Sequence, residues 1–234
     1  MIRASEIVMI HLPFADRLGA GNALALELSR RVDTSNAVVL ALARGGVPVG
    51  FAIARSLDLP LDVIVARKLG VPWQPELAMG AIAGSARTLN EGMLAKLEIS
   101  AAEVEKVIFR EQAEMKRREE LYRASQPAPE LAGLTAILVD DGLATGSTML
   151  AAIRHARKLH AAAIVVAVPV GSRDACGQLR SEADDVICLA IPDFFYAVGE
   201  WYRDFSQVGD SEVRHLLAES RERMTKTLKP TLAG

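Results

Sequence analysis

Continuous runs of β-branched and aliphatic residues recur along the chain, and their lack of polar alternation predicts strands that are buried on both faces. Segments with the apolar spacing of helices lie between these runs. The predicted strands cover 37–43, 61–66, 135–140, 162–168 and 186–190, and the predicted helices cover 21–31, 47–57, 147–159 and 173–183. This alternation is typical of a doubly wound α/β domain, with a mostly parallel central sheet flanked by helices.

Ligands of such sheets bind beyond the carboxyl ends of the strands. This rule selects three places for a functional site, namely the residues that follow Ala43, Ala66 and Val139. Charged residues come directly after each of these positions. We therefore expect the ligand-binding edge of the sheet to combine cations with carboxylates.

The alternation of strand and helix is interrupted by a charged segment over 91–125. Its stretch 103–123 combines helix-favouring residues with opposite charges four positions apart, which predicts an inserted helical arm. Pro127 and Pro129 end the arm before the sheet resumes, because two prolines so close together cannot continue a helix.

The segment 192–210 is rich in aromatic residues. A last helix is expected from Asp210 or Ser211 to about Met224, with either residue as its cap. We expect a single domain over 1–225, followed by a disordered tail over 226–234.

Composition limits the partners of the chain. Its 234 residues carry a formal net charge of −2, and half of them are hydrophobic. No strongly basic tract suggests a nucleic-acid partner, and no stretch approaches the roughly 20 apolar residues of a membrane span. Cys176 and Cys188 lie outside metal-ligand spacings, which indicates small buried residues. We therefore expect a cytoplasmic protein that binds a small molecule, with no nucleic-acid or membrane partner.

The strand that ends at Val139 leads into two carboxylates, a loop of small residues and the start of a helix. A helix start offers unpaired backbone N–H groups and the positive end of the helix dipole, which together favour an anion. A glycine lets the backbone approach a ligand closely, and hydroxyl groups add donors. The loop therefore predicts a cradle for a phosphate monoester, composed of Ala144, Thr145, Gly146, Ser147 and Thr148.

The two carboxylates, Asp140 and Asp141, would repel a phosphate placed directly between them, but they accept hydrogen bonds well from sugar hydroxyls. A ribose 5-phosphate fits the order of the segment, with its hydroxyls toward the acids and its phosphate on the loop. The alternative is a capped helix in which Asp141 or Thr145 only satisfies backbone donors. P-loop and GxGxxG motifs fit less well, because neither spacing is present.

The segment 139–148 resembles the signature with which type I phosphoribosyltransferases bind 5-phosphoribosyl-1-pyrophosphate (PRPP). That signature is an apolar strand, two acids, two loop residues and Ala-Thr-Gly-x-Thr, and the sequence matches it at every defining position. The resemblance implies the type I phosphoribosyltransferase fold. It also implies transfer of phosphoribose from PRPP to a base or similar small nucleophile, with release of pyrophosphate.

Basic residues follow the other two strands of this edge. Arg44, Gly45 and Gly46 lie between a strand and a helix, where Arg44 and the helix-start amides point at one anion, although a plain tight turn is the alternative. Arg67 and Lys68 would repel each other without an anion, unless both are simply solvated. The resemblance assigns Arg44, Gly45 and Gly46 to the pyrophosphate loop, and pyrophosphate would supply the second anion as well.

The resemblance extends from about Phe14 to Leu217. Over this length the sequence is similar to a bacterial and archaeal family of stand-alone predicted phosphoribosyltransferases whose acceptor is not assigned. The similarity includes Asp16-Arg17 with Ala20-Gly21, the residues 44–46, 67–70 and 75–81, and 197–199 with Trp201, Tyr202, Asp204 and Phe205. It therefore indicates the fold and the donor substrate better than the acceptor.

Departure of pyrophosphate leaves an oxocarbenium-like ribose, so roughly three negative charges have to be neutralised. We expect Mg²⁺ as cofactor, arriving with the substrate and held by Asp140 and Asp141 indirectly, through ribose hydroxyls or water. These two acids, with Arg44 and Lys68, are the expected catalytic residues, and Arg67 is a further candidate for binding pyrophosphate.

The resemblance also implies a hood that binds the acceptor, expected here over 192–210. Its candidates for stacking on a planar base are Phe194, Phe195, Tyr196, Trp201 and Tyr202, although aromatic residues are also ordinary core. Many type I enzymes also close a loop over the site, and its counterpart here is the arm with its cations at 116–118. Those charges suit a solvated helix face as well, and the arm would equally serve a homodimer.

Two other functions share the same ligand chemistry. A non-enzymatic regulator would bind PRPP or a nucleotide in the same cradle and relay its occupancy through the arm. A hydrolase would use water as the acceptor. The signature alone does not separate them from a transferase, because all three bind ribose phosphate.

Overall fold

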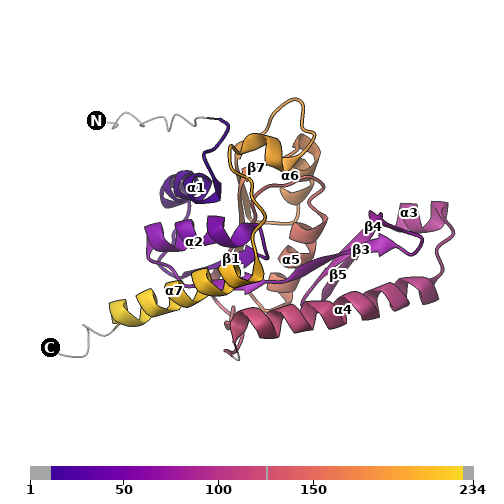
Figure 1. Ribbon diagram of the computed structural model, residues 1–234, viewed down its shortest axis with the longest axis horizontal. Coiled ribbons are helices and arrows are strands. Elements are labelled where there is room, and N and C mark those ends of the chain that lie inside the picture. Colours follow the sequence, from indigo (N-terminus) through magenta and orange to yellow (C-terminus); the bar gives the residue numbers. More distant parts are fainter. Residues whose placement is uncertain (1–11, 125, 229–234) are drawn as a thin grey trace.

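The computed structural model describes residues 12–124 and 126–228, which form an α/β body with a projecting arm (Figure 1). The body contains a five-stranded parallel sheet in the order β2-β1-β6-β7-β8. Its strands are β1 (Ala37–Leu42), β2 (Leu61–Ile64), β6 (Thr135–Val139), β7 (Ala163–Val170) and β8 (Asp185–Ala190). The predicted α/β class with a mostly parallel central sheet is therefore confirmed.

The two faces of this sheet are buried in separate apolar cores. In β1, Val39 and Ala41 point into one core, whereas Val38 and Leu40 point into the other. Because both faces are covered, the residues that point to either side of the strand are apolar. The first core lies under α1 (Arg17–Arg31), α2 (Gly46–Leu57) and α7 (Asp210–Leu228), and the second lies under α5 (Ser147–Lys158) and α6 (Arg173–Leu179).

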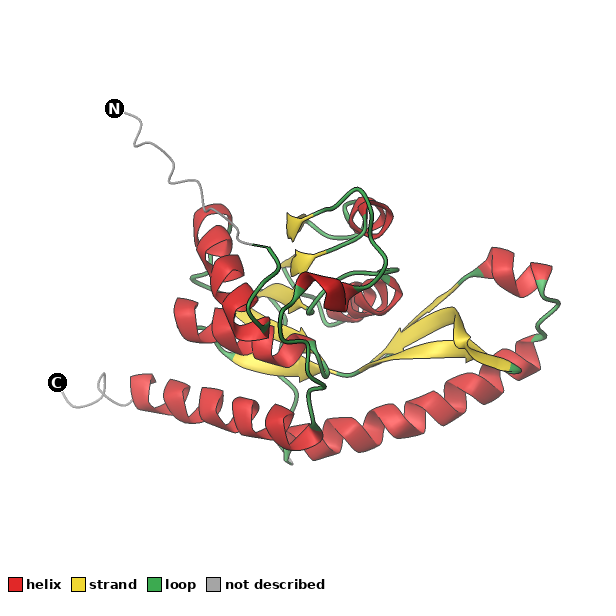
Figure 2. Cartoon of the chain, turned by 45° about the horizontal axis from the view of Figure 1, so that its top comes forward, coloured by secondary structure: helices red, strands yellow, loops and turns green. Residues whose placement is uncertain are grey.

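The arm contains a second sheet that the sequence analysis did not predict. Three antiparallel strands, in the order β3-β4-β5, are followed by two helices that replace the single predicted helical arm (Figure 2). One face of this sheet packs on the longer helix, where Leu69 and Met79 share a core with Val104 and Val107. The elements are β3 (Ala66–Val71), β4 (Gln74–Ala83), β5 (Ala86–Leu89), α3 (Glu91–Lys96) and α4 (Ala101–Arg123).

The base of the arm is attached to the body on two sides. At its end, Arg123 Nε lies 3.1 Å from Asp62 Oδ2, and Arg123 Nη2 donates to the Val63 carbonyl at 2.8 Å. At the β4–β5 turn, Lys158 Nζ of α5 donates to the Ser85 carbonyl at 2.9 Å. The sheet of the arm therefore leans on α5, the helix that follows β6.

The C-terminal part of the chain returns to the edge of the sheet before its last helix. The segment 192–210 contains only a short 3₁₀ turn, η1 (Val198–Trp201), and α7 begins at Asp210, one of the two predicted caps. α7 continues to Leu228, beyond the predicted end, and the remainder of the predicted tail, 229–234, lies outside the described residues. Within 12–124 and 126–228, none of the helices combines the length and apolar character needed to cross a membrane.

Candidate functional site

The predicted phosphate cradle, residues 144–148, lies at the start of α5. Gly146 caps this helix with a φ of 71°, in the left-handed region that glycine adopts most readily. The hydroxyls of Thr145 and Ser147 lie 3.2 Å apart in the same turn. Ser172 supports the turn from the side, because its hydroxyl donates to the Ala144 carbonyl at 2.8 Å. The cradle therefore presents backbone amides and hydroxyls from one helix start.

The second acid, Asp141, is held by a residue far away in the sequence. Arg17 Nε and Nη2 lie 2.9 and 2.8 Å from Asp141 Oδ2, and Arg17 Nη1 donates to the Ser206 carbonyl at 2.8 Å. Tyr202 donates its hydroxyl proton to the Asp141 carbonyl at 2.6 Å. Burial raises the pKa of Asp141, and the adjacent Arg17 guanidinium opposes that rise.

The first acid, Asp140, has fewer partners for its negative charge. Its Oδ1 accepts a hydrogen bond from the Asp141 backbone N–H at 2.9 Å, and within the described part of the chain it forms no ion pair. Burial, followed by the charge of Asp141, raises the pKa of Asp140 well above its usual value, while Arg17 and Lys68 act in the opposite direction. A carboxylate in this position favours hydroxyl donors or a cation as neighbours.

The Arg44-Gly45-Gly46 loop lies directly against the acid pair. A Cβ atom added to Gly45 would come within 2.0 Å of Asp141 Oδ2, and one added to Gly46 would lie 2.6 Å from the Val139 carbonyl oxygen. Both positions therefore require glycine, because any side chain would displace the acids. The prediction that these two loops meet at one edge of the sheet agrees with this geometry.

Arg44 points toward the start of α7 in this structure. Its Nη1 lies 3.6 Å from Asp210 Oδ1, and the same carboxylate oxygen accepts the Tyr122 hydroxyl at 2.6 Å. Burial and the hydrogen bond to Asp210 raise the pKa of Tyr122 to about 12. The side chain of Arg44 is only partly buried, so an incoming anion would compete with Asp210 for it.

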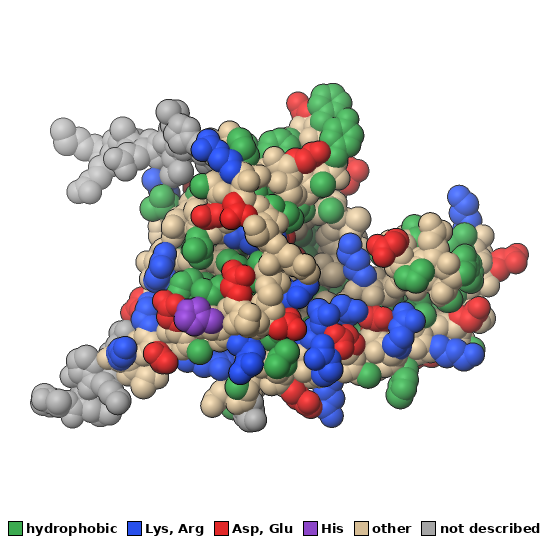
Figure 3. All heavy atoms as spheres, in the orientation of Figure 1, with side chains coloured by type: hydrophobic (Ala, Val, Ile, Leu, Met, Phe, Trp, Pro, Cys, Tyr) green, Lys and Arg blue, Asp and Glu red, His purple; other side chains and the backbone are tan. Residues whose placement is uncertain are grey.

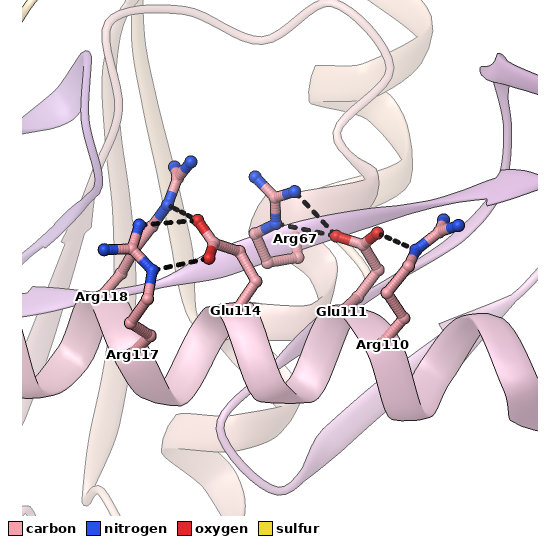
Figure 4. Close-up of polar contacts among 6 residues, drawn as sticks. All are labelled: Arg67, Arg110, Glu111, Glu114, Arg117 and Arg118. Carbon is pink, nitrogen blue, oxygen red and sulfur yellow. Dashed lines mark hydrogen bonds and ion pairs between the residues drawn. The ribbon is translucent and has the colours of Figure 1, made fainter.

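Arg67 and Lys68 do not follow a strand of the central sheet, as the sequence analysis expected, but lie within β3 of the arm. Arg67 has an acidic neighbour, because its Nε and Nη2 lie 3.0 and 2.7 Å from Glu111 Oε2 on α4 (Figure 4). The sequence analysis expected either an anionic ligand or solvent beside this cation, and the structure places a carboxylate of α4 there. The pyrophosphate contact of Arg67 stays a prediction that would require exchange of Glu111 for the ligand.

Lys68 faces the cleft instead. A cavity of about 700 Å³ separates the arm from the phosphate cradle, and its lining includes Lys68, Glu76 and Glu91 from the arm and Thr145 and Ser147 from the cradle. Among the described residues, Lys68 has no carboxylate within ion-pair distance, although its charge reaches Asp140. Figure 3 shows Lys and Arg side chains gathered where the arm leaves the body, below this hollow.

The cations of α4 are largely compensated by their own helix. Arg117 Nε and Arg118 Nε lie 2.8 and 2.7 Å from the two carboxylate oxygens of Glu114 (Figure 4), and these contacts hold the pKa of Glu114 at about 2. Lys116 lines a small separate cavity with Glu119 and Glu120. The contacts agree with a solvated helix face and leave the proposed closing role of 116–118 untested.

Apart from Tyr202, the four other predicted hood aromatics lie in different environments. Phe194 and Tyr196 are exposed, at 78% and 81% of their full surface. Trp201 packs beside Phe14 and Tyr202 in a small apolar cluster, and Phe195 is partly buried. None of these four is part of the cavity lining, so stacking on an acceptor stays a prediction.

Sequence reasoning missed the residues that hold Asp141. Arg17 appeared only as part of the wider resemblance, and Tyr202 was considered only for stacking on the acceptor. Arg17 is 9% exposed and its Cζ lies 3.9 Å from the centre of the Phe205 ring. No local sequence pattern could predict this contact, because Arg17 and Asp141 are 124 positions apart. An arginine directly after a helix-capping aspartate was the one local hint.

Known proteins are similar to this chain over most of its length. The family model described as "Phosphoribosyl transferase domain" matches residues 73–206. Two curated proteins from two strains of Mycobacterium tuberculosis, both named as predicted phosphoribosyl transferases, are each 46% identical over 201 residues. The match covers 86% of this chain but 45% of each relative, so the chain spans less than half of their length.

A solved structure is similar over almost its full length. The crystal structure of TT1426 from Thermus thermophilus has 38% sequence identity to this chain and superposes on it with a TM-score of 0.74. The similarity covers 88% of this chain and 98% of that protein. Body and arm are therefore an arrangement that a related bacterial protein shares.

Proposed function

Because the chain belongs to the phosphoribosyl transferase domain family, we propose that it is a Mg²⁺-dependent phosphoribosyltransferase that uses PRPP as donor. The acceptor would be a nitrogenous base or a similar small nucleophile. The observation that carries the proposal is the direct contact between the Arg44-Gly45-Gly46 loop and the acid pair, beside the helix start of the phosphate cradle. This contact lets one ligand reach a phosphate site, a sugar site and a second anion site.

Each part of PRPP has a matching partner. The 5-phosphate would accept hydrogen bonds from residues 144–148, and the ribose hydroxyls would donate to the acid pair. The pyrophosphate would meet the backbone of Gly45 and Gly46 and the side chains of Arg44 and Lys68. In the reaction the bond from C1 of ribose to pyrophosphate breaks, and its electron pair leaves with the pyrophosphate oxygen. A new C1–N bond forms as the nucleophile loses a proton.

Magnesium fits the donor set of the site. Asp140 and Asp141 offer the hard oxygen atoms that Mg²⁺ prefers, and Mg²⁺ commonly retains several waters and binds substrate phosphates. In the portions of the chain that the structure describes, no cluster of three or more His, Cys, Asp or Glu side chains could hold a metal ion by itself. We therefore propose that the ion is bound together with PRPP, where it would neutralise the leaving pyrophosphate.

The test is calorimetric titration of PRPP with Mg²⁺, followed by measurement of pyrophosphate release with a panel of purine, pyrimidine and other ring acceptors. Binding with acceptor-dependent release supports the transferase. Binding with release in the absence of any acceptor would favour a hydrolase, and binding without release would favour a regulator. An Asp140→Asn/Asp141→Asn double variant is expected to lose PRPP binding while keeping its fold, as checked by circular dichroism.

A further inference from the structure

The two adjacent acids of the site have different surroundings. Asp141 Oδ2 accepts from both Nε and Nη2 of Arg17, and its backbone carbonyl accepts from Tyr202. Asp140 forms no such contact in the described structure beyond the hydrogen bond from its neighbour's N–H. One carboxylate is therefore paired with a cation of the chain itself, and the other has no such partner among the described residues.

Contacts on several sides hold Arg17 against Asp141. All three nitrogen atoms of the Arg17 guanidinium are engaged, two by Asp141 and one by the Ser206 carbonyl. The plane of the guanidinium lies over the Phe205 ring, 3.9 Å from Cζ to the ring centre, with Tyr202 at 5.9 Å. A delocalised cation held by hydrogen bonds and aromatic contacts loses little further freedom when it binds a carboxylate.

Backbone hydrogen bonds near the Arg17–Asp141 pair join residues 14 and 15 to the predicted hood. Phe14 N–H donates to the Trp201 carbonyl at 2.8 Å, and Arg203 N–H donates to the Phe14 carbonyl at 2.8 Å. Asp204 N–H donates to the Ala15 carbonyl at 3.0 Å. The second half of the predicted hood, 201–206, is therefore built against Arg17 and the acid pair.

On the basis of the proposed function, we propose that Arg17 is a positioning residue that divides the work of the acid pair. It neutralises Asp141 and fixes that side chain against Gly45, and it leaves Asp140 as the carboxylate that accepts hydrogen bonds from the ribose hydroxyls. Residues 201–206 then serve the donor site through Arg17. This division replaces the expectation that both acids bind the ribose equally.

The discriminating measurement compares ribose 5-phosphate with 2-deoxyribose 5-phosphate, each titrated with Mg²⁺ into the full chain. Loss of a hydroxyl that donates to a charged carboxylate weakens binding by about 10- to 100-fold, so the wild type should prefer ribose by that factor. The preference isolates the contact between acid and hydroxyl, because a general loss of structure weakens both ligands alike. PRPP with Mg²⁺ is titrated in parallel.

Four variants separate the two acids. Asp140→Asn should abolish the preference for ribose. Arg17→Met should weaken both ligands, because it leaves Asp141 buried without a partner. The double variant Arg17→Met/Asp141→Asn removes both charges together, so it should bind both ligands more tightly than Arg17→Met does and should keep the preference for ribose. Arg30→Met, on the exposed side of α1, is the matched control and should behave as wild type.

The outcomes are distinct. A double variant that folds, as judged by its melting curve, yet lacks the preference for ribose would show that Asp141 itself binds the sugar, and it would overturn the division of roles. The same double variant with preference intact, beside an Asp140→Asn variant without it, supports the proposal. A wild type that binds neither ribose 5-phosphate nor PRPP would overturn the proposed function together with this inference.

Discussion

Arg67 and Glu111 join the sheet of the arm to its long helix, with Nε and Nη2 of the guanidinium both donating to Glu111 Oε2, at 3.0 and 2.7 Å. Glu111 is 8% exposed and also accepts from Arg110 at 3.1 Å. The pair therefore lies between two layers of the arm, so we expect its removal to lower the folding stability of the protein.

We expect Arg67→Met to lower the melting temperature by about 2–4 °C, which corresponds to ~1 kcal/mol for a domain of this size. The affinity for PRPP with Mg²⁺ should change less than about threefold, because Arg67 would have to leave Glu111 to reach pyrophosphate. Differential scanning fluorimetry and calorimetry measure the two effects. A loss of affinity of tenfold or more would contradict this expectation and would show that Arg67 contacts pyrophosphate.

Lys68 is expected to behave in the opposite way. It faces the cleft with no carboxylate in ion-pair contact among the described residues, so its charge is available to a ligand. Lys68→Met should weaken PRPP binding by about 10- to 100-fold and leave the melting temperature nearly unchanged. Lys106→Met, on the far part of α4, provides the control, and equal effects of the two substitutions would exclude a specific role for Lys68.

At Gly45, the size of the side chain alone should decide the affinity for PRPP. A methyl group there would come within 2.0 Å of Asp141 Oδ2, so Gly45→Ala must move the acid. We expect at least a tenfold loss of PRPP affinity and a destabilisation of about 1–3 kcal/mol, typical of overpacking. Gly177→Ala is the matched control, because a Cβ at that helical position has no neighbour within 4 Å. Full affinity in Gly45→Ala would mean that the acid loop yields at little cost.

His155 should make the base of the arm sensitive to acid. Its Nδ1 accepts from the Ser85 N–H at 3.4 Å, and burial, with the charges of Arg123 and Lys158, lowers the pKa of His155 below 6.5. Because the unfolded chain then binds the proton more tightly than the folded one, stability falls as the pH drops from about 6.5 through the lowered pKa.

We expect His155→Gln to reduce this acid-dependent loss of stability, measured as the difference in unfolding free energy between about pH 7.5 and pH 5.5. Identical pH profiles for wild type and His155→Gln would rule out this histidine as the source.

The central sheet was predictable because its strands are uninterrupted apolar runs between helical segments. The sheet of the arm was not, because its strands contain many small residues, including Gly70, Ala78, Gly80 and Ala83, which carry little strand preference. Its apolar face is covered by α4 rather than by another strand, so pairing and burial together stabilise a segment with a weak local signal.

In the candidate site, the parts that lie close together in the sequence were found and the distant parts were missed. The strand, acids and helix start over 139–148 form one continuous stretch, so their order could be interpreted directly. Arg17 and Tyr202 reach Asp141 from opposite ends of the chain, and only the folded backbone brings them together. Likewise Glu111 became visible as the partner of Arg67 only once α4 was seen to pack on β3.

The arm leaves the body after β2 and comes back to β2, where Arg123 contacts Asp62 and the Val63 carbonyl. Its strands form a sheet of their own and take no place in the order of the central sheet. A segment whose two ends meet can be lengthened, shortened or exchanged during evolution without rethreading the domain that carries it. The geometry thus allows related proteins to alter the wall of the cleft while inheriting the same acid pair and helix start.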